Sequence, residues 1–205
     1  FNGFERMVHW LTAVSFILLA VSGLNVTFGR SLLLPLIGEA SFGALSATMK
    51  SIHNYVAFAF MAGVILTFLI WVKDNVPGII DVKWLKAGGG IIGNEHPPAG
   101  RFNGGQKMIF WSVVVGGVVL SISGLNLLFA DEGIAHLQFW STVHGVLAMV
   151  MTAVIMAHIY IGSIGMEGAF DAMGSGEVDL NWAKHHHSLW VAQEMDKGAA
   201  APVRM

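Results

Sequence analysis

Long apolar stretches dominate the pattern of this chain. Four of them contain no aspartate, glutamate, lysine or arginine, namely residues 7–29, 51–72, 108–130 and 133–166. Each is long enough for an α-helix to cross the hydrocarbon core of a bilayer, which takes about 20 residues at a rise of about 1.5 Å per residue. The pattern therefore predicts an all-α integral membrane protein, a four-transmembrane-helix bundle with spans at approximately 7–29, 51–72, 108–130 and 142–166.

The segments between these spans differ in character. Residues 31–50, SLLLPLIGEASFGALSATMK, are apolar but contain proline and glycine, so we expect them to lie at the membrane interface. Residues 73–107 form a loop rich in glycine and proline, and its part KAGGGIIGNEHPPAGRFNGGQK, residues 86–107, is predicted to be irregular. Residues 167–205 are polar, which predicts a solvated tail attached to a single membrane domain over residues 1–205.

The two halves of the chain share a sequence pattern. VSGLNVTF closes the first apolar stretch, and ISGLNLLF closes the third. SIHNYVAFAFMAG in the second stretch aligns with TVHGVLAMVMTAV in the fourth, which sets His53 against His144. We interpret the chain as a doubled helical hairpin, since internal repeats are common in membrane proteins. The alternative is a chance similarity between apolar segments.

Composition and charge narrow the function. Hydrophobic residues make up 55% of the chain and charged residues 12%, which is too apolar for an ordinary water-soluble domain. Nine lysines and arginines fall on the side of the two ends and the 73–107 loop, against two on the other side, so both termini are predicted to be cytoplasmic. The nine are Arg6, Lys73, Lys83, Lys86, Arg101, Lys107, Lys184, Lys197 and Arg204. A net charge of -2 argues against a nucleic-acid partner.

Four of the nine histidines lie within or at the ends of the apolar stretches: His9, His53, His144 and His158. Ionisable residues inside membrane helices are costly and usually functional. His144 and His158 are fourteen residues apart, which places them on one helix face about 21 Å apart along the axis. One metal ion cannot bridge that distance, so these two histidines belong to separate sites.

Alternating helix direction sorts the histidines by depth, with His53 and His144 toward the outer face and His9 and His158 toward the cytoplasm. Two imidazoles from separate helices are the axial ligands that a b-type haem requires, and helix bundles commonly hold such cofactors. The sequence therefore predicts two haem b groups, with iron ligands His53/His144 and His9/His158. For any single histidine the alternative is a structural hydrogen bond or a place among the lipid headgroups. Zinc is less favoured, because its structural sites take about four ligands.

The absence of cysteine from this sequence limits the chemistry further. A thiolate-bound iron–sulfur cluster and a covalently attached c-type haem both need cysteine, so any haem must be held non-covalently.

The third span opens with RFNGGQKMIFW, which allows two interpretations. Asn103 and Gln106 have the spacing of a capping box, in which each side chain bonds the other residue's backbone N–H. The amide side chains and the glycine Gly105 at a helix N-terminus could equally offer hydrogen-bond donors to a quinone carbonyl. The sequence alone does not choose between these interpretations.

Several motifs together resemble the membrane-anchor b-type cytochrome subunit, the gamma subunit, of respiratory formate dehydrogenases. The motifs are FERMVHW, SIHNYVAF, GNEH, FNGGQKMIFW, VHGVLA with AHIYIG, and WAKHHHSLW, and they span nearly the whole chain in the family's order. The resemblance implies the same haem ligands as above, and a quinone pocket at Asn103, Gly105 and Gln106 close to His158. Position 104 is glycine here, where the family pattern has alanine.

The resemblance also implies the protein's setting. Such a subunit lies in the bacterial inner membrane as a multi-pass protein. It receives electrons from an iron–sulfur (beta) subunit, which is attached to a molybdenum- or tungsten-containing catalytic (alpha) subunit. The electrons cross to the inner haem and reduce menaquinone or ubiquinone at the cytoplasmic side, so the chain has no formate-oxidising site of its own.

Two other functions remain open at this point. The chain could be the cytochrome b anchor of a membrane-bound hydrogenase or of another molybdenum oxidoreductase, which the identity of the attached subunits would decide. It could also be a haem-free four-helix anchor or transporter module whose histidines handle protons, which a reduced-minus-oxidised spectrum would decide.

Overall fold

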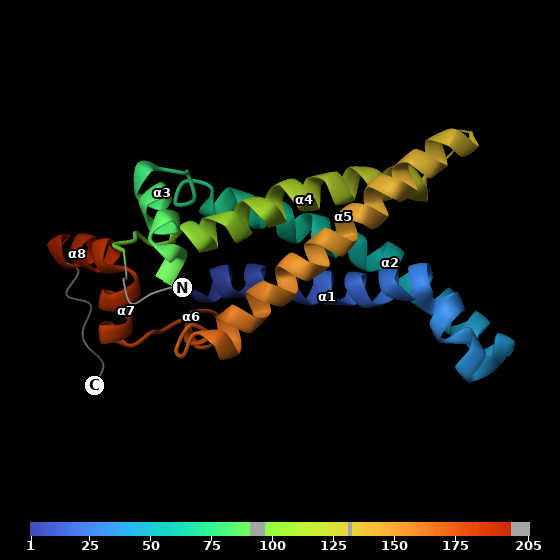
Figure 1. The fold of residues 1–205 in the computed structure, drawn as a ribbon, viewed down its shortest axis with the longest axis horizontal. Helices are drawn as coiled ribbons and strands as arrows, with labels where there is room; N and C mark the ends of the chain where they lie inside the picture. Colours follow the sequence, from blue (N-terminus) through green and yellow to red (C-terminus); the bar gives the residue numbers. More distant parts are fainter. Residues whose placement is uncertain (91–96, 131–132, 198–205) are drawn as a thin grey trace. The chain divides into compact units, whose positions relative to one another are not determined.

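The computed structural model describes residues 1–90, 97–130 and 133–197, and every regular element in these ranges is helical. The four long helices are α1 (Gly3–Leu32), α2 (Leu34–Trp71), α4 (Gly104–Leu128) and α5 (Ile134–Tyr160) (Figure 1). The short ones are α3 (Ile79–Lys86), α6 (Asp171–Gly174), α7 (Leu180–His186) and α8 (Ser188–Asp196), with a 3₁₀ turn η1 (Gly88–Gly90) and a π-helical turn η2 (Ile161–Gly165). The GNEH motif at residues 93–96, and Arg204, lie outside the described residues.

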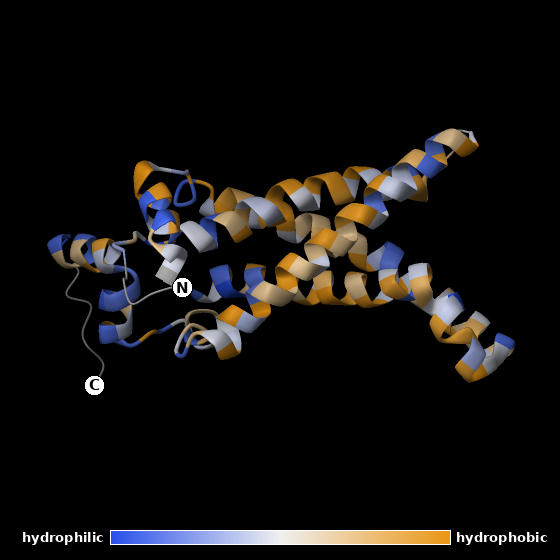
Figure 2. Cartoon of the chain, in the orientation of Figure 1, coloured by the Kyte–Doolittle hydropathy of each residue, from blue (hydrophilic) through white to orange (hydrophobic). Residues whose placement is uncertain are grey.

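The prediction of four long apolar helices is confirmed. Helices α1, α2, α4 and α5, the last continued through η2, are each long and apolar enough to cross a membrane. Figure 2 shows mostly hydrophobic residues along these four helices, whereas many residues of α3, α7 and α8 are hydrophilic. Helices α1 and α4 begin before the predicted spans because polar capping groups, rather than the change in hydropathy, decide where they begin.

The start of α1 illustrates this. The Asn2 side chain accepts a hydrogen bond from the Glu5 backbone N–H, and the Glu5 carboxylate accepts one from the Asn2 backbone N–H, each at 2.9 Å. This capping box satisfies two N–H groups that have no partner within the helix. Helix α1 therefore starts at Gly3, four residues before the apolar stretch.

The connection between the first two spans is helical over most of its length. Helix α2 begins at Leu34 and continues to Trp71, with one non-helical residue, Gly38, at φ 77° and ψ 167°. Glycine suits this position because a side chain is rarely tolerated at positive φ. Residues 39–50 thus form a helix that continues directly into the second span.

The chain divides into two compact units. The bundle unit comprises Asn2–Ile70 and Ser112–Ala157, and the loop-and-tail unit comprises Phe1, Trp71–Trp111 and the chain from His158 onward.

The core of the bundle unit is small and apolar. Phe16, Phe60, Val64 and Met151 are buried together, and the rings of Phe16 and Phe60 lie 5.9 Å apart. Lipid tails are as apolar as these side chains, so close packing rather than the hydrophobic effect must hold the helices together.

Glycines bring the helices of this unit into close contact. A β-carbon at Gly117 of α4 would lie 2.8 Å from a methyl group of Val64 on α2. A β-carbon at the neighbouring Gly116 would lie 2.6 Å from the sulfur of Met151 on α5. Both side chains occupy space that any residue other than glycine would fill, so this pair of glycines sets the separation of α4 from both neighbours.

The loop-and-tail unit is organised around buried polar groups. Asn75 is fully buried, and its side-chain amide donates to the Trp71 carbonyl at 2.9 Å. The Asn75 carbonyl accepts from the indole N–H of Trp111 at 2.9 Å. Lys107 and Asp81 form an ion pair of 2.9 Å in which both side chains are largely buried. Specific contacts therefore hold the described part of the 73–107 loop, which contains the helix α3.

The tail folds onto this loop, and the prediction of a solvated tail is wrong for His187. His187 is 6% exposed and its Nδ1–H donates to the Gly100 carbonyl at 2.8 Å. The backbone N–H of Leu189 donates to the Ala99 carbonyl at 3.1 Å. Burial lowers the pKa of His187, and the hydrogen bond to Gly100 opposes that shift in part. His187 is thus a neutral structural residue that joins tail and loop.

Candidate functional site

The four intramembrane histidines lie on three helices. His9 is on α1, His53 on α2, and His144 and His158 on α5, and each is half-buried. The first three belong to the bundle unit, and His158 belongs to the loop-and-tail unit. The pairing of His9 with His158 therefore stays a prediction.

The structure brings His53 and His144 together. Their ring centroids lie 6.2 Å apart, with the ring planes inclined at 70°. A metal held between two imidazoles needs two bonds of about 2 Å, together with the short distance from each ring centre to its own nitrogen. These two bond lengths and the two distances from ring centre to nitrogen add up to nearly the observed separation of the ring centroids, so His53 and His144 would hold one haem iron between them.

A serine accompanies each of these imidazoles. Ser22 Oγ lies 2.9 Å from Nδ1 of His53, and Ser123 Oγ lies 2.9 Å from Nδ1 of His144. Both serines come from the SGLN segments that mark the internal repeat. Reasoning from the sequence used this repeat as a sign of duplication and missed the serines, although their matching positions were visible.

The predicted capping box at the start of α4 is confirmed. Gln106 Oε1 accepts from the Asn103 backbone N–H at 2.8 Å, and Asn103 Oδ1 accepts from the Gln106 backbone N–H at 2.9 Å. Each side-chain oxygen is engaged in this cap, which leaves the NH₂ group of each amide as a hydrogen-bond donor. A capping role and a ligand-binding role are therefore compatible for these two residues.

The glycines beside this cap pack against a tryptophan. A β-carbon at Gly104 would lie 3.0 Å from the Trp84 indole and 3.2 Å from the Asp81 carbonyl oxygen, and one at Gly105 would lie 3.0 Å from the same indole. Trp84 itself is 9% exposed. Close approach of α4 to Trp84 is a structural reason for both glycines, and Trp84 was not anticipated from the sequence.

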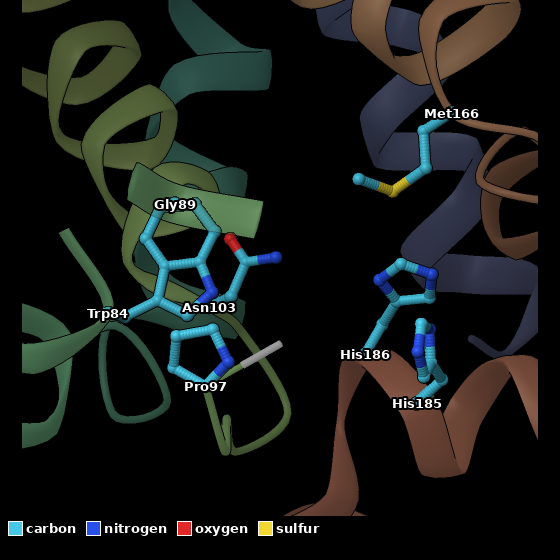
Figure 3. Close-up of a pocket in the computed structure, with 7 residues that line it drawn as sticks. All are labelled: Trp84, Gly89, Pro97, Asn103, Met166, His185 and His186. Atoms are coloured by element: carbon cyan, nitrogen blue, oxygen red, sulfur yellow. The ribbon is translucent and has the colours of Figure 1, made fainter. Parts of the chain in front are cut away.

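Asn103 also lines a pocket within the loop-and-tail unit. Figure 3 shows Asn103, Trp84, Gly89 and Pro97 on one side of this pocket, and Met166, His185 and His186 on the other. Of the three residues predicted to bind a quinone, Asn103 lines the pocket, and Gly105 and Gln106 directly follow it on α4.

A set of membrane-spanning helices with two imidazoles facing each other inside the bundle defines a helical membrane protein of the haem-binding class. The sequence model of the prokaryotic cytochrome b561 family matches residues 1–176, and the chain belongs to this family.

Curated relatives match nearly the whole chain. The cytochrome b556(fdo) subunit of formate dehydrogenase from Escherichia coli (strain K12) is 33% identical over 192 residues, which cover 91% of this chain and 88% of the relative. The nitrate-inducible formate dehydrogenase cytochrome b556(Fdn) subunit of the same organism is 30% identical over 204 residues, covering 96% and 90%. The formate dehydrogenase cytochrome b556 subunit of Haemophilus influenzae (strain ATCC 51907 / DSM 11121 / KW20 / Rd) is 28% identical over 202 residues, covering 93% and 80%. The resemblance inferred from the motifs is confirmed.

Proposed function

We propose that this chain is the dihaem cytochrome b subunit of a formate dehydrogenase. It anchors the complex in the bacterial inner membrane and carries electrons from an iron–sulfur subunit to a quinone on the cytoplasmic side. The observation that carries this proposal is the facing pair His53 and His144, at a ring separation of 6.2 Å, in a chain whose relatives are formate dehydrogenase cytochromes.

The histidines hold the redox groups in this proposal. A haem, when bound, supplies an iron that takes up and gives back one electron at a time. His53 and His144 would hold one such iron through the nitrogens that face away from their serines. His9 and His158 would hold the second. Ligands on three helices fix the two sites at different depths, so electrons have a route across the membrane.

The start of α4 binds and orients the quinone. The side-chain oxygens of Asn103 and Gln106 are engaged in the helix cap, so their NH₂ groups are the donors available to a quinone oxygen. Gly105 lets the Trp84 indole, which lines the same pocket as Asn103, pack against the first turn of α4. The pocket beside Asn103 also contains His185 and His186, which can supply protons there.

The charge distribution supports the orientation. Nine of the eleven lysines and arginines lie in the two ends and the 73–107 loop, and this excess of positive charge supports a cytoplasmic location for that side. The first turn of α4, with the quinone residues, then faces the cytoplasm. Protons consumed in quinone reduction come from that side, so turnover moves charge across the membrane, worth about 2.3 kcal/mol per elementary charge at 100 mV.

Purification of the intact complex in detergent tests this function. The expected result is two haem b groups per chain in a reduced-minus-oxidised spectrum, reduction of both by formate, and reoxidation by a quinone. Mass spectrometry should identify an iron–sulfur subunit and a molybdenum- or tungsten-containing subunit as partners. A colourless preparation would refute the cytochrome function. If the attached enzyme proved to be a hydrogenase, the chain would be a hydrogenase anchor and not a formate dehydrogenase subunit.

A further inference from the structure

Two serine–histidine pairs occupy matching places in the two halves of the bundle unit. Ser22 and Ser123 are each 0% exposed, and each lies 2.9 Å from the Nδ1 atom of its histidine, His53 or His144. The pairs connect α1 with α2 and α4 with α5. Every atom of this arrangement lies within one compact unit.

Each serine hydroxyl has a single proton, and this decides the direction of both serine–histidine hydrogen bonds. Ser22 Oγ also lies 2.6 Å from the carbonyl oxygen of Leu18 and 3.2 Å from that of Leu19. A carbonyl oxygen only accepts, and a serine hydroxyl has one proton, so that proton is donated to the preceding turn of the helix. The serine oxygen then accepts from Nδ1–H of His53, and the Nε2 atom of His53 keeps its lone pair.

The second pair follows the same logic. Ser123 Oγ lies 2.8 Å from the Val119 carbonyl oxygen and 3.1 Å from that of Leu120. It therefore accepts from Nδ1–H of His144, whose Nε2 atom also keeps its lone pair. Both facing imidazoles are in the tautomer that a metal ligand requires.

The glycine that follows each serine packs against the imidazole ring. A β-carbon at Gly23 would lie 3.3 Å from Cε1 of His53, and a β-carbon at Gly124 would lie 3.3 Å from Cε1 of His144. Cε1 stands between the two ring nitrogens, so this contact limits ring rotation while the serine holds Nδ1. The SG dipeptide of each SGLN segment thus fixes both the position and the tautomer of one imidazole.

We propose that Ser22 and Ser123 are paired positioning residues that set the midpoint potential of the haem held by His53 and His144. This inference rests on the proposed function. A hydrogen-bond acceptor at Nδ1–H makes an imidazole more basic toward a metal at Nε2. A more basic ligand stabilises the ferric state, so the two serines keep the potential of this haem low.

Redox titration of the whole complex, carrying Ser22→Ala, Ser123→Ala or both, tests the proposal. Each single variant should raise the midpoint potential of the same haem. The expected shift is up to 59 mV for a one-electron couple, which corresponds to about a tenfold change in the ferric-to-ferrous ratio at a given potential. The double variant should show about the sum of the two shifts, because each serine acts on its own ligand. The second haem should keep its midpoint. The low-spin EPR g values of the affected haem should change with it.

A serine on the same membrane helix serves as the matched control. Ser121 Oγ donates to the Gly117 carbonyl at 2.6 Å, and it forms no hydrogen bond with an imidazole in the described part of the chain. Ser121→Ala should therefore leave both midpoints and both EPR signals unchanged. An equal shift in this variant would overturn the proposal, because the effect would then belong to helix α4 as a whole.

If the alanine variants lose haem, cysteine variants at the same two positions test the proposal instead. Ser22→Cys and Ser123→Cys preserve shape and provide a weaker acceptor, so they should raise the same midpoint by a smaller amount. Retained haem with no shift in any of these variants, or a shift of the second haem, overturns the proposal. Absence of a b-type signal in the unaltered complex would instead refute the proposed function on which it rests.

Discussion

Thr12 on α1 and Gly63 on α2 lie in close contact. A β-carbon at Gly63 would stand 2.5 Å from Oγ1 of Thr12 and 3.2 Å from its α-carbon. Thr12 Oγ1 donates to the Val8 carbonyl at 2.9 Å and lies 3.4 Å from Oγ1 of Thr67. The two backbones touch here, and small and hydroxyl-bearing residues make that contact possible.

Gly63→Ala should destabilise the bundle by about 1–3 kcal/mol, as overpacking does in other well-packed interiors. The new methyl group meets backbone as well as side chain at Thr12, so rotation of a side chain cannot relieve the clash. Thermal unfolding in detergent measures the loss. Gly43→Ala in the same helix is the control, because a β-carbon there meets nothing within 4 Å. The thermal stability of this variant should equal or exceed that of the unaltered protein.

His144→Ala should remove one haem while the second remains. The variant deletes one of two facing ligands at the 6.2 Å pair and leaves His9 and His158 in place. The reduced-minus-oxidised spectrum should lose about half of its b-type amplitude, and quinone reduction by formate should stop, while reduction of an artificial dye by the catalytic subunits continues. His136→Ala, on the same helix, should keep both haems. A variant at His144 that still holds two haems would contradict the ligand assignment.

Two variants of Gln106 separate its capping role from its predicted role toward quinone. Gln106→Glu keeps an oxygen to accept from the Asn103 N–H but removes the NH₂ donor, so it should preserve stability and weaken quinone-site inhibitors. Gln106→Ala should weaken the inhibitors and also cost about 0.5–2 kcal/mol through loss of the cap. Inhibitor titration of quinone reduction, with thermal unfolding alongside, measures both effects. Unchanged inhibition in both variants would leave Gln106 as a cap alone.

The connection between tail and loop should weaken in acid. Because the pKa of His187 is lowered in the folded protein, the unfolded chain binds more protons as the pH falls below the ordinary value of 6.5. The contribution of neutral His187 to the free energy of unfolding is fully present above pH 6.5. It is lost progressively as the pH falls toward the lowered pKa. The protection factors of α7 and α8 in amide hydrogen exchange, which are corrected for the intrinsic pH dependence of exchange, should therefore decrease as the pH falls below about 6.5.

His187→Gln should remove most of this pH dependence, since an amide does not titrate. His185→Gln is the matched control, because His185 lies in the same histidine run but is exposed. It should leave the pH dependence of exchange as it is in the unaltered protein. Equal pH dependence in all three proteins would show that His187 is not the group responsible.

The sequence predicted those features that depend on long apolar runs and on spacing. Four long helices and the closeness of His53 and His144 follow from hydropathy, helix direction and the repeat, because these act over tens of residues. The cap at Asn103 and Gln106 was also predictable, because a capping box is a local arrangement with a fixed spacing.

Features that depend on tertiary contact were not predictable in the same way. Trp84 and His187 lie in a glycine-rich loop and a polar tail, and their burial depends on each segment finding the other. The helix at residues 39–50 was not predicted, because proline and glycine are unfavourable within helices. In the structure the non-helical backbone inside α2 is confined to Gly38. Serine in an apolar helix has many uses, so Ser22 and Ser123 acquired a specific role only when their partners were in view.

Each half of the bundle contributes one serine, one glycine and one imidazole to the same place. One such hairpin supplies a single imidazole, so both halves are needed to provide two ligands. Because each ligand has its own serine and glycine, the surroundings of one imidazole can differ from those of the other. The asparagines of the SGLN segments already differ in this way: the Asn25 side chain donates across to Ser46, whereas the Asn126 side chain donates back to Ile122 in its own helix.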